Sequence, residues 1–262
     1  MSSNLSLAER PAIKLYLDLL ERSLTNTLLN AEPDADQDNE LRYVGEFIDH
    51  YIEGRAISML PLARFRNIRE CMFEIIERQV PGDFIETGVW RGGATIFMRG
   101  LLKALDIRDR FVWVADSFRG LPSPDPDKFP VEARAHRGAV MAKSYKHFAV
   151  GIDEVRANFR TYALLDAQVR FLEGWFKDTL PAAPIERLAL MRLDGDYYES
   201  TMDALVALYD RLSIGGFVIV DDYGEETWTC CRQAVTEFRS SRSITEPLIR
   251  VDSKCYFWRR DK

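Results

Sequence analysis

The chain has 262 residues, of which 47% are hydrophobic and 29% are charged, and its formal net charge is −6. This composition is typical of one globular α/β domain with room for a small appendage. The acidic balance argues against a nucleic-acid surface, which needs clustered Lys and Arg. The sequence has no apolar run long enough to cross a membrane, no signal-peptide core and no C-x-x-C spacing among its four cysteines. We therefore expect a cytoplasmic protein with no nucleic-acid or membrane partner.

The first 82 residues favour helices. Apolar residues recur at helical spacing over 5–30, and the acidic stretch 31–40 predicts a loop. Residues 41–80 predict two further helices divided near Pro61, and Pro81-Gly82 ends the helical pattern. The leucine-rich start also suits a subunit interface, so we expect a homodimer.

From residue 83 onward, predicted strands alternate with predicted helices. Strands are expected over 83–88, 110–116, 169–174, 187–194 and 215–222, with helices over 92–105, 150–164, 200–212 and 226–239. The segments 246–252 and 254–260 predict an antiparallel pair that closes the sheet. The pattern indicates a mainly parallel, seven-stranded sheet covered by helices on both faces.

One connection is too long for a simple crossover. It begins with the proline-rich and charged stretch LPSPDPDKFP, and we expect an insertion at about 119–165. Insertions of this length beside strand ends usually form lids or binding loops. His136 and His147 lie within it and are candidate contacts to a ligand.

A glycine-rich turn joins the first predicted strand to a helix. Its sequence, Glu86-Thr87-Gly88-Val89-Trp90-Arg91-Gly92-Gly93, has neither the dinucleotide spacing nor a P-loop lysine. Glycine would let the backbone approach a ligand, and Asp116 at the next strand end could accept hydrogen bonds from ribose hydroxyls. Without clustered Lys or Arg for phosphate, the pattern suits a cationic nucleoside such as S-adenosylmethionine. The alternative is a tight turn before a helix.

Two later strands each end in paired aspartates. Asp194 and Asp196 follow one apolar run, and Asp221 and Asp222 follow the next. Because parallel strands end at one edge of a sheet, these carboxylates should converge and need a cation. Oxygen ligands favour Mg²⁺, Ca²⁺ or Mn²⁺, which would lower the pKa of an alcohol while a neighbouring carboxylate takes its proton. The alternative is that the aspartates cap the following helices, Asp196 above all.

Five ordered motifs resemble the macrocin O-methyltransferase family of antibiotic deoxysugar methyltransferases. They are FIETGVWRGGAT, ADSFRGLP, LEGWFKDTLP, RLDGDYYEST and GGFVIVDDYG, and the resemblance spans roughly residues 40–260. It implies a class I, Rossmann-like S-adenosylmethionine-dependent methyltransferase, with a helical N-terminal extension over 1–82 that caps the acceptor side. The methyltransferase domain would be 83–262. The expected acceptor is a deoxysugar hydroxyl of a glycosylated antibiotic precursor, the 4-hydroxyl of noviose in aminocoumarins.

The resemblance also implies roles for individual residues. S-adenosylmethionine would be held by Glu86, Thr87, Gly88, Asp116, Ser117, Gly174 and Trp175. By likeness to metal-dependent catechol methyltransferases, Asp194, Asp221 and Asp222 match the ligands of Mg²⁺ or another divalent cation. A lysine found in that group is missing here, so Asp196 is the expected base, with Asp194 second.

Two other classes of function are also compatible with the sequence. A nicotinamide dehydrogenase could use a similar sheet, although the glycine spacing and the aspartates disfavour it. A non-catalytic nucleoside-binding protein could keep the fold without turnover.

Overall fold

The computed structural model describes residues 10–30, 51, 53, 55–138, 147–224 and 229–262. The predicted loop over 31–40 and most of the first helix predicted within 41–80 lie outside these residues. Among the described residues, no helix combines the length and the apolar character that a membrane span requires.

The core of the fold is a seven-stranded sheet in the order β3-β2-β1-β4-β5-β7-β6. The strands are β1 (Asp83–Thr87), β2 (Val112–Asp116), β3 (Val169–Glu173), β4 (Leu188–Leu193), β5 (Leu212–Val220), β6 (Ile249–Arg250) and β7 (Tyr256–Arg259). The first five are parallel, β7 runs antiparallel to β5, and β6 runs antiparallel to β7. The predicted sheet and its closing antiparallel pair are confirmed.

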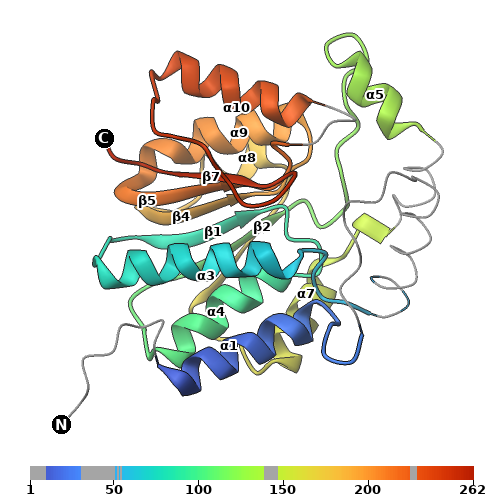
Figure 1. Ribbon diagram of the computed structural model, residues 1–262. Coiled ribbons are helices and arrows are strands. Elements are labelled where there is room, and N and C mark those ends of the chain that lie inside the picture. Colours follow the sequence, from blue (N-terminus) through green and yellow to red (C-terminus); the bar gives the residue numbers. More distant parts are fainter. Residues whose placement is uncertain (1–9, 31–50, 52, 54, 139–146, 225–228) are drawn as a thin grey trace.

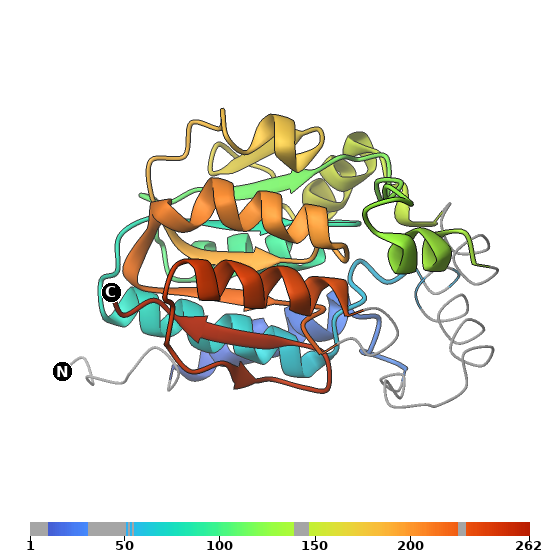
Figure 2. The ribbon, with the colours of Figure 1, turned by 90° about the horizontal axis from the view of Figure 1, so that it is seen from above.

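Helices cover both faces of this sheet (Figure 1). The helices α1 (Pro11–Leu24), α3 (Leu62–Glu77) and α4 (Gly93–Ala104) lie on one face. The helices α8 (Phe176–Thr179), α9 (Tyr198–Leu208) and α10 (Cys230–Ser241) lie on the other, with the short 3₁₀ helix η3 (Tyr209–Arg211) following α9. The short helix α5 (Pro130–His136) stands apart from both layers, and the view from above shows the same separation (Figure 2).

A separate apolar core fills each side of the sheet. Phe65, Phe84 and Phe97 belong to the core under α3 and α4, whereas Leu205 and Phe238 belong to the core under α9 and α10. Because both faces are covered, a central strand has to be apolar at every position rather than at alternate ones. All six residues of β4 are buried accordingly, and the charged Arg192 is the exception in its composition.

The predicted insertion at about 119–165 contains a helix of the main core. In α7 (Ile152–Thr161), Val155 and Phe159 are fully buried, and Phe159 makes an edge-to-face contact with Phe171 of β3. Their four-residue spacing places both on one face of the helix. The part of the insertion that leaves the main layers and is described therefore centres on α5.

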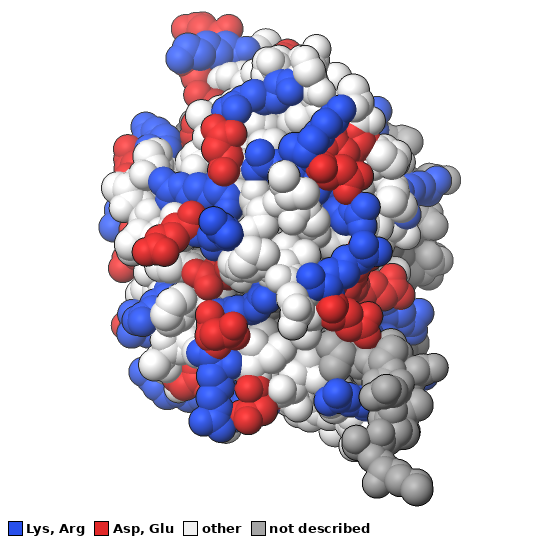
Figure 3. All heavy atoms as spheres, turned by 90° about the vertical axis from the view of Figure 1, so that its left-hand side faces the viewer, with Lys and Arg blue, Asp and Glu red and all other residues white. Residues whose placement is uncertain are grey.

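Charges of both signs are mixed on the face turned away from α5 (Figure 3). Lys and Arg alternate there with Asp and Glu, and no block of one sign dominates the view. Such a surface produces little long-range field, because neighbouring charges of opposite sign cancel at a distance.

The end of β1 touches the backbone that follows β4. Gly88 has a φ of +89°, and a Cβ atom built on it would lie 1.7 Å from the carbonyl oxygen of Asp194. The glycine is thus required by the protein's own backbone, whereas the sequence suggested close approach of a ligand. In the same contact, the Asp194 amide donates to the Thr87 carbonyl at 2.9 Å.

We expect Gly88→Ala to destabilise the fold by roughly 3 kcal/mol or more, because it adds both a backbone clash and an unfavourable φ. Gly151→Ala is the matched control: Gly151 has a φ of −70°, and a Cβ atom built on it would meet no described atom within 4 Å. The control should cost less than about 1 kcal/mol. Urea denaturation of both variants measures the difference, and equal losses would contradict the steric argument.

Candidate active site

Four neighbouring strands end in one row. The register aligns Thr87 of β1 with Ala115 of β2 and Leu193 of β4, and aligns Leu193 with Val220 of β5. The next residue of each strand or connection is Gly88, Asp116, Asp194 and Asp221. Backbone hydrogen bonds of 2.9 Å continue past the strand ends, from Gly88 to Ala115, from Asp194 to Thr87 and from Asp221 to Leu193. The ladder therefore fixes the residues that the sequence singled out in a common row.

The acidic rim, defined here as Asp194, Asp196, Asp221 and Asp222, lies on this edge. Asp194, Asp221 and Asp222 each offer a carboxylate oxygen, and these oxygens lie within 4.8 Å of one another. Helix capping does not account for them, since the N-cap residues of α9 and α10 are Tyr197 and Thr229. Asp196 immediately precedes the α9 cap and has a left-handed backbone, with a φ of +58°.

A buried arginine underlies the rim. Arg192 is 0% exposed and donates to three carboxylates. Its Nη1 contacts Glu86 and lies 2.7 Å from Asp194 Oδ2, while its Nη2 contacts Asp221 Oδ1. From the sequence, the converging carboxylates were expected to need a bound cation, and Arg192 supplies part of that positive charge from within β4.

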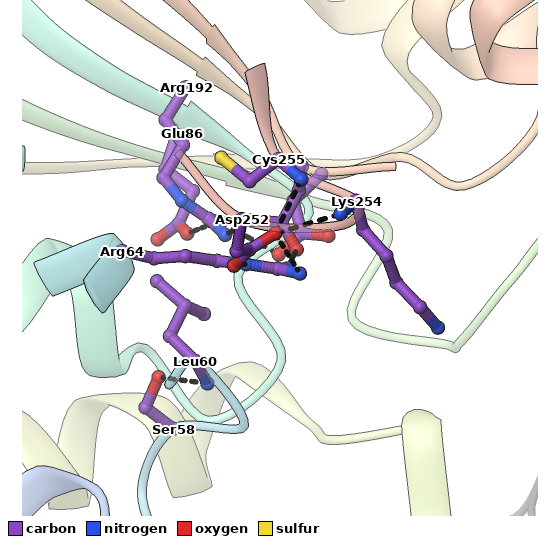
Figure 4. A network of polar contacts seen from close by, with 10 residues as sticks. Ser58, Leu60, Arg64, Glu86, Arg192, Asp252, Lys254 and Cys255 are labelled. Carbon is purple, nitrogen blue, oxygen red and sulfur yellow. Dashed lines mark hydrogen bonds and ion pairs between the residues drawn. The ribbon is translucent and has the colours of Figure 1, made fainter. Parts of the chain in front are cut away.

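A second arginine reaches the rim from α3. The Nη1 atom of Arg64 contacts Asp221 Oδ2, and its Nε lies 2.7 Å from Asp252 Oδ2. Asp252 belongs to the connection between β6 and β7 and accepts the amides of Lys254 and Cys255 at 2.8 and 2.7 Å. Figure 4 shows Arg64 extending from its helix to Asp252, beside Arg192 and Glu86. Both oxygens of Asp221 are therefore held by guanidinium groups.

Asp222 and Asp194 are less well compensated by positive charge than Asp221. Asp222 Oδ2 is buried and accepts no hydrogen bond from the described residues. Burial, followed by repulsion from Asp196, Asp194 and Asp221, raises the pKa of Asp222 well above its usual range. Burial and the nearby Asp221 carboxylate also raise the pKa of Asp194 to about 6. Such a site favours a positive ligand, because Asp222 and Asp194 lack a full counter-charge.

The residues expected to hold a nucleoside lie on the β1, β2 and β3 side of the row. The Asp116 carboxylate accepts the amides of Val89 and Phe118, both at 2.8 Å. The Ser117 hydroxyl donates to the Gly120 carbonyl at 2.7 Å. Burial raises the pKa of Asp116, although these backbone hydrogen bonds act in the opposite direction. Asp116 therefore fixes the turn after β1, and its remaining lone pairs can still accept further donors.

Gly174 and Trp175 follow β3 on the same edge. The Gly174 amide donates to the Asp116 carbonyl at 2.9 Å, which ties the two strand ends together. Trp175 is partly exposed and is the N-cap of α8. On β1, Glu86 and Thr87 are buried, and the atoms Glu86 Oε2 and Thr87 Oγ1 have no hydrogen-bond partner among the described residues.

The helix α5 packs on the loop that carries Asp196. The Phe129 ring, just before α5, stacks on Tyr198 with 5.2 Å between ring centroids. Glu132 Oε1 accepts the Tyr198 amide at 3.3 Å, and His136 Nδ1 lies 2.9 Å from the Tyr197 hydroxyl oxygen. Of the two candidate histidines, His136 thus reaches the rim loop, whereas the His147 carbonyl accepts the Trp90 indole N–H at 2.7 Å.

Sequence reasoning missed both arginines of the rim. The signal for Arg192 was present, because a charged residue inside an apolar strand predicts a buried ion pair. No comparable signal marked Arg64, which lies in a helix rich in arginine and far from Asp221 in the sequence. Its contact depends on how α3 packs against the sheet.

Comparisons with known proteins identify the family and support the fold. The Macrocin-O-methyltransferase (TylF) family model matches residues 35–260. The chain is 46% identical to demethyldecarbamoylnovobiocin O-methyltransferase of Streptomyces niveus, over 95% of this chain and 94% of that protein. It is 43% identical to mycinamicin III 3''-O-methyltransferase of Micromonospora griseorubida, over 95% of this chain and 97% of that protein. Among solved structures, the O-methyltransferase NovP superposes with a TM-score of 0.82 at 45% identity, covering 95% of this chain and 100% of that one.

We expect Arg192→Met to lower the free energy of unfolding by about 3–5 kcal/mol, because it leaves three buried carboxylates without their shared partner. Arg242→Met is the control, since Arg242 pairs with Asp210 at an exposed position and its loss should change stability little. Chemical denaturation in EDTA measures both. A loss for Arg192→Met no larger than for the control would contradict the role of Arg192.

Proposed function

Because the chain belongs to the macrocin O-methyltransferase (TylF) family, we propose that it transfers a methyl group from S-adenosylmethionine to a deoxysugar hydroxyl of a glycosylated antibiotic precursor, at a divalent cation site. Membership in this family favours methyl transfer over both hydride transfer and a non-catalytic role. The observation that carries the proposal is the acidic rim, in line with the carboxyl ends of β1, β2, β4 and β5.

We propose that Asp194, Asp221 and Asp222 hold the cation. Their chemistry fits, since oxygen-only donors suit Mg²⁺ or a similar ion, and the buried Asp222 Oδ2 lacks any other described partner. When bound, the ion stabilises the negative charge that develops on an alcohol oxygen as it loses its proton. Arg192 orients Asp194 and Asp221 from within β4, so these two carboxylates would need little rearrangement to bind the ion.

We propose that S-adenosylmethionine lies over the β1, β2 and β3 ends. Asp116 would accept the ribose hydroxyls, and Glu86 Oε2 and Thr87 Oγ1, which have no hydrogen-bond partner among the described residues, would act as acceptors for the donor's cationic end. Gly88, Ser117 and Gly174 would contribute contacts along the turns. Trp175, partly exposed beside them, offers an aromatic face to the adenine.

The proton of the acceptor hydroxyl would pass to Asp196, with Asp194 as the second candidate. Asp196 lies in the loop before α9, and Phe129 and Glu132 contact Tyr198 at the start of that helix. The methyl group moves from the sulfonium to the sugar oxygen, the O–H bond breaks, and S-adenosylhomocysteine leaves as a neutral thioether. Positioning the hydroxyl in line with the sulfonium methyl provides much of the rate.

We propose that the N-terminal region 1–82 and the insertion at about 119–165 cover the acceptor side of the methyltransferase domain 83–262. The glycine-rich turn is bonded to both. Arg91 Nη1 donates to the carbonyls of Tyr51 and Ala56, both at 2.9 Å, and Trp90 donates to the His147 carbonyl. The glycine-rich turn, where S-adenosylmethionine is proposed to bind, is thereby linked to the N-terminal region and to the insertion.

The proposed acceptor is the 4-hydroxyl of noviose in an aminocoumarin precursor. The support is the 46% identity to demethyldecarbamoylnovobiocin O-methyltransferase. The 43% identity to a mycinamicin 3''-O-methyltransferase makes macrolide sugars the natural comparison.

We also propose a homodimer. Leu15 and Leu19, which are 72% and 56% exposed, lie four residues apart on α1 and present apolar surface beyond what the monomer buries.

We expect methylation of desmethyl noviose glycosides in the presence of S-adenosylmethionine and Mg²⁺, seen by mass spectrometry as a gain of one methyl group. Exhaustive EDTA should abolish turnover and added Mg²⁺ should restore it, since the alcohol then lacks charge stabilisation. Full activity in EDTA would contradict the metal proposal. Methylation of macrolide sugars, with none on noviose, would contradict the acceptor but not the reaction.

We expect Asp196→Asn to reduce kcat by about 10²- to 10⁴-fold, the usual contribution of a positioned base, while S-adenosylmethionine affinity by calorimetry stays unchanged. Asp210→Asn, at an exposed position paired with Arg242, is the matched control and should keep normal turnover. Wild-type kcat in Asp196→Asn would move the role of base to Asp194.

A further inference from the structure

Two arginines contact the Asp221 carboxylate, one at each oxygen. Arg192 contacts Oδ1, and Arg64 contacts Oδ2. Each carboxylate oxygen keeps a second lone pair, so Asp221 can still bind an ion. The positive charge beside that oxygen nevertheless opposes the approach of a dication. The neighbouring Asp222 has no such cationic partner at its buried Oδ2 among the residues that the structure describes.

The two arginines differ in burial and in the carboxylates that they contact. Arg192 is 0% exposed, comes from a central strand and holds three carboxylates. The Arg64 side chain is 12% exposed, comes from the first turn of α3 and has a second partner, Asp252, away from the acidic rim. Arg64 can therefore move toward Asp252 without leaving its charge unpaired, whereas Arg192 cannot leave the rim.

We propose that Arg64 is a positioning residue that opposes the metal ion: it neutralises and holds Asp221 in the metal-free protein and sets how tightly a divalent cation binds. This inference rests on the metal site proposed above. The guanidinium keeps the carboxylates from repelling one another before the ion arrives. When the ion binds, Arg64 yields Asp221 Oδ2 and retains Asp252, whose carboxylate is fixed by two backbone amides.

The same contact links metal binding to the N-terminal helical region. Arg64 joins α3 to the rim, and Leu60 and Ser58 lie on its N-terminal side (Figure 4). Removing the Arg64 charge should therefore change two quantities together. The metal-free protein loses stability, because Asp221 and Asp252 lose a counter-charge, and the ion then stabilises the fold by a larger amount.

The test is titration of the full-length protein with Mg²⁺ alone by calorimetry, without S-adenosylmethionine or acceptor. Arg64→Gln should bind Mg²⁺ on the order of tenfold more tightly than the wild type. Arg64→Lys, which keeps the charge, should stay within about threefold of the wild type. Asp252→Asn should bind more weakly by about threefold, because Arg64 then directs its charge to Asp221 alone.

Arg69→Gln is the matched control. Arg69 lies on the same helix and pairs with Asp18 and Glu21 of α1, away from the rim. It should leave the Mg²⁺ affinity within about twofold of the wild type, because its charge is not directed at the rim. Melting temperatures with EDTA and with Mg²⁺ provide the second readout, and the rise caused by Mg²⁺ should be larger in Arg64→Gln than in the wild type.

Unchanged or weaker Mg²⁺ binding in Arg64→Gln would overturn the inference, as would tighter binding in Arg69→Gln of the same size. If Arg64→Gln does not fold, Asp252→Asn decides, and unchanged or tighter binding there would overturn it. No Mg²⁺ binding by the wild type would instead overturn the proposed metal site, which separates the two failures.

Discussion

The buried contact between Arg192 and three carboxylates is the interaction on which the candidate site depends. Glu86, Asp194 and Asp221 come from three adjacent strands, and their repulsion at this distance would separate the strand ends. A guanidinium inside β4 lets them converge without any ligand. The cost is the burial of a charged side chain in a strand that is otherwise apolar. The three carboxylates offset this cost because they pair with the guanidinium charge.

Charge is distributed unevenly across the site as a result. Both oxygens of Asp221 are held by arginine, whereas the buried Oδ2 of Asp222 has no hydrogen-bond partner among the described residues. Asp221 therefore maintains the geometry of the site, and Asp222 retains the capacity to attract a cation. This arrangement would keep the proposed cation site formed before the ion binds, which would help methyl transfer because the acceptor oxygen has to be positioned in line with the sulfonium methyl group.

The turn after β1 is bonded to segments on both sides of the candidate site. Gly88 permits β1 and the loop after β4 to touch, and the Asp116 carboxylate holds the turn that follows Gly88. Trp90 and Arg91, in the same turn, bond the insertion and the N-terminal region. A change in the turn after β1 would therefore affect both the proposed nucleoside site and the proposed sugar site.

The sequence by itself determined the alternation of strands and helices, the closing antiparallel pair and the aspartates at the strand ends, because apolar periodicity and residue chemistry are local properties. The five family motifs carried the assignment to macrocin O-methyltransferases. Tertiary structure alone decided that Arg64 reaches Asp221, that α7 belongs to the main core and that Gly88 faces the backbone of Asp194. Such contacts join residues far apart in the chain, and their geometry follows from how the layers pack, which no local pattern encodes.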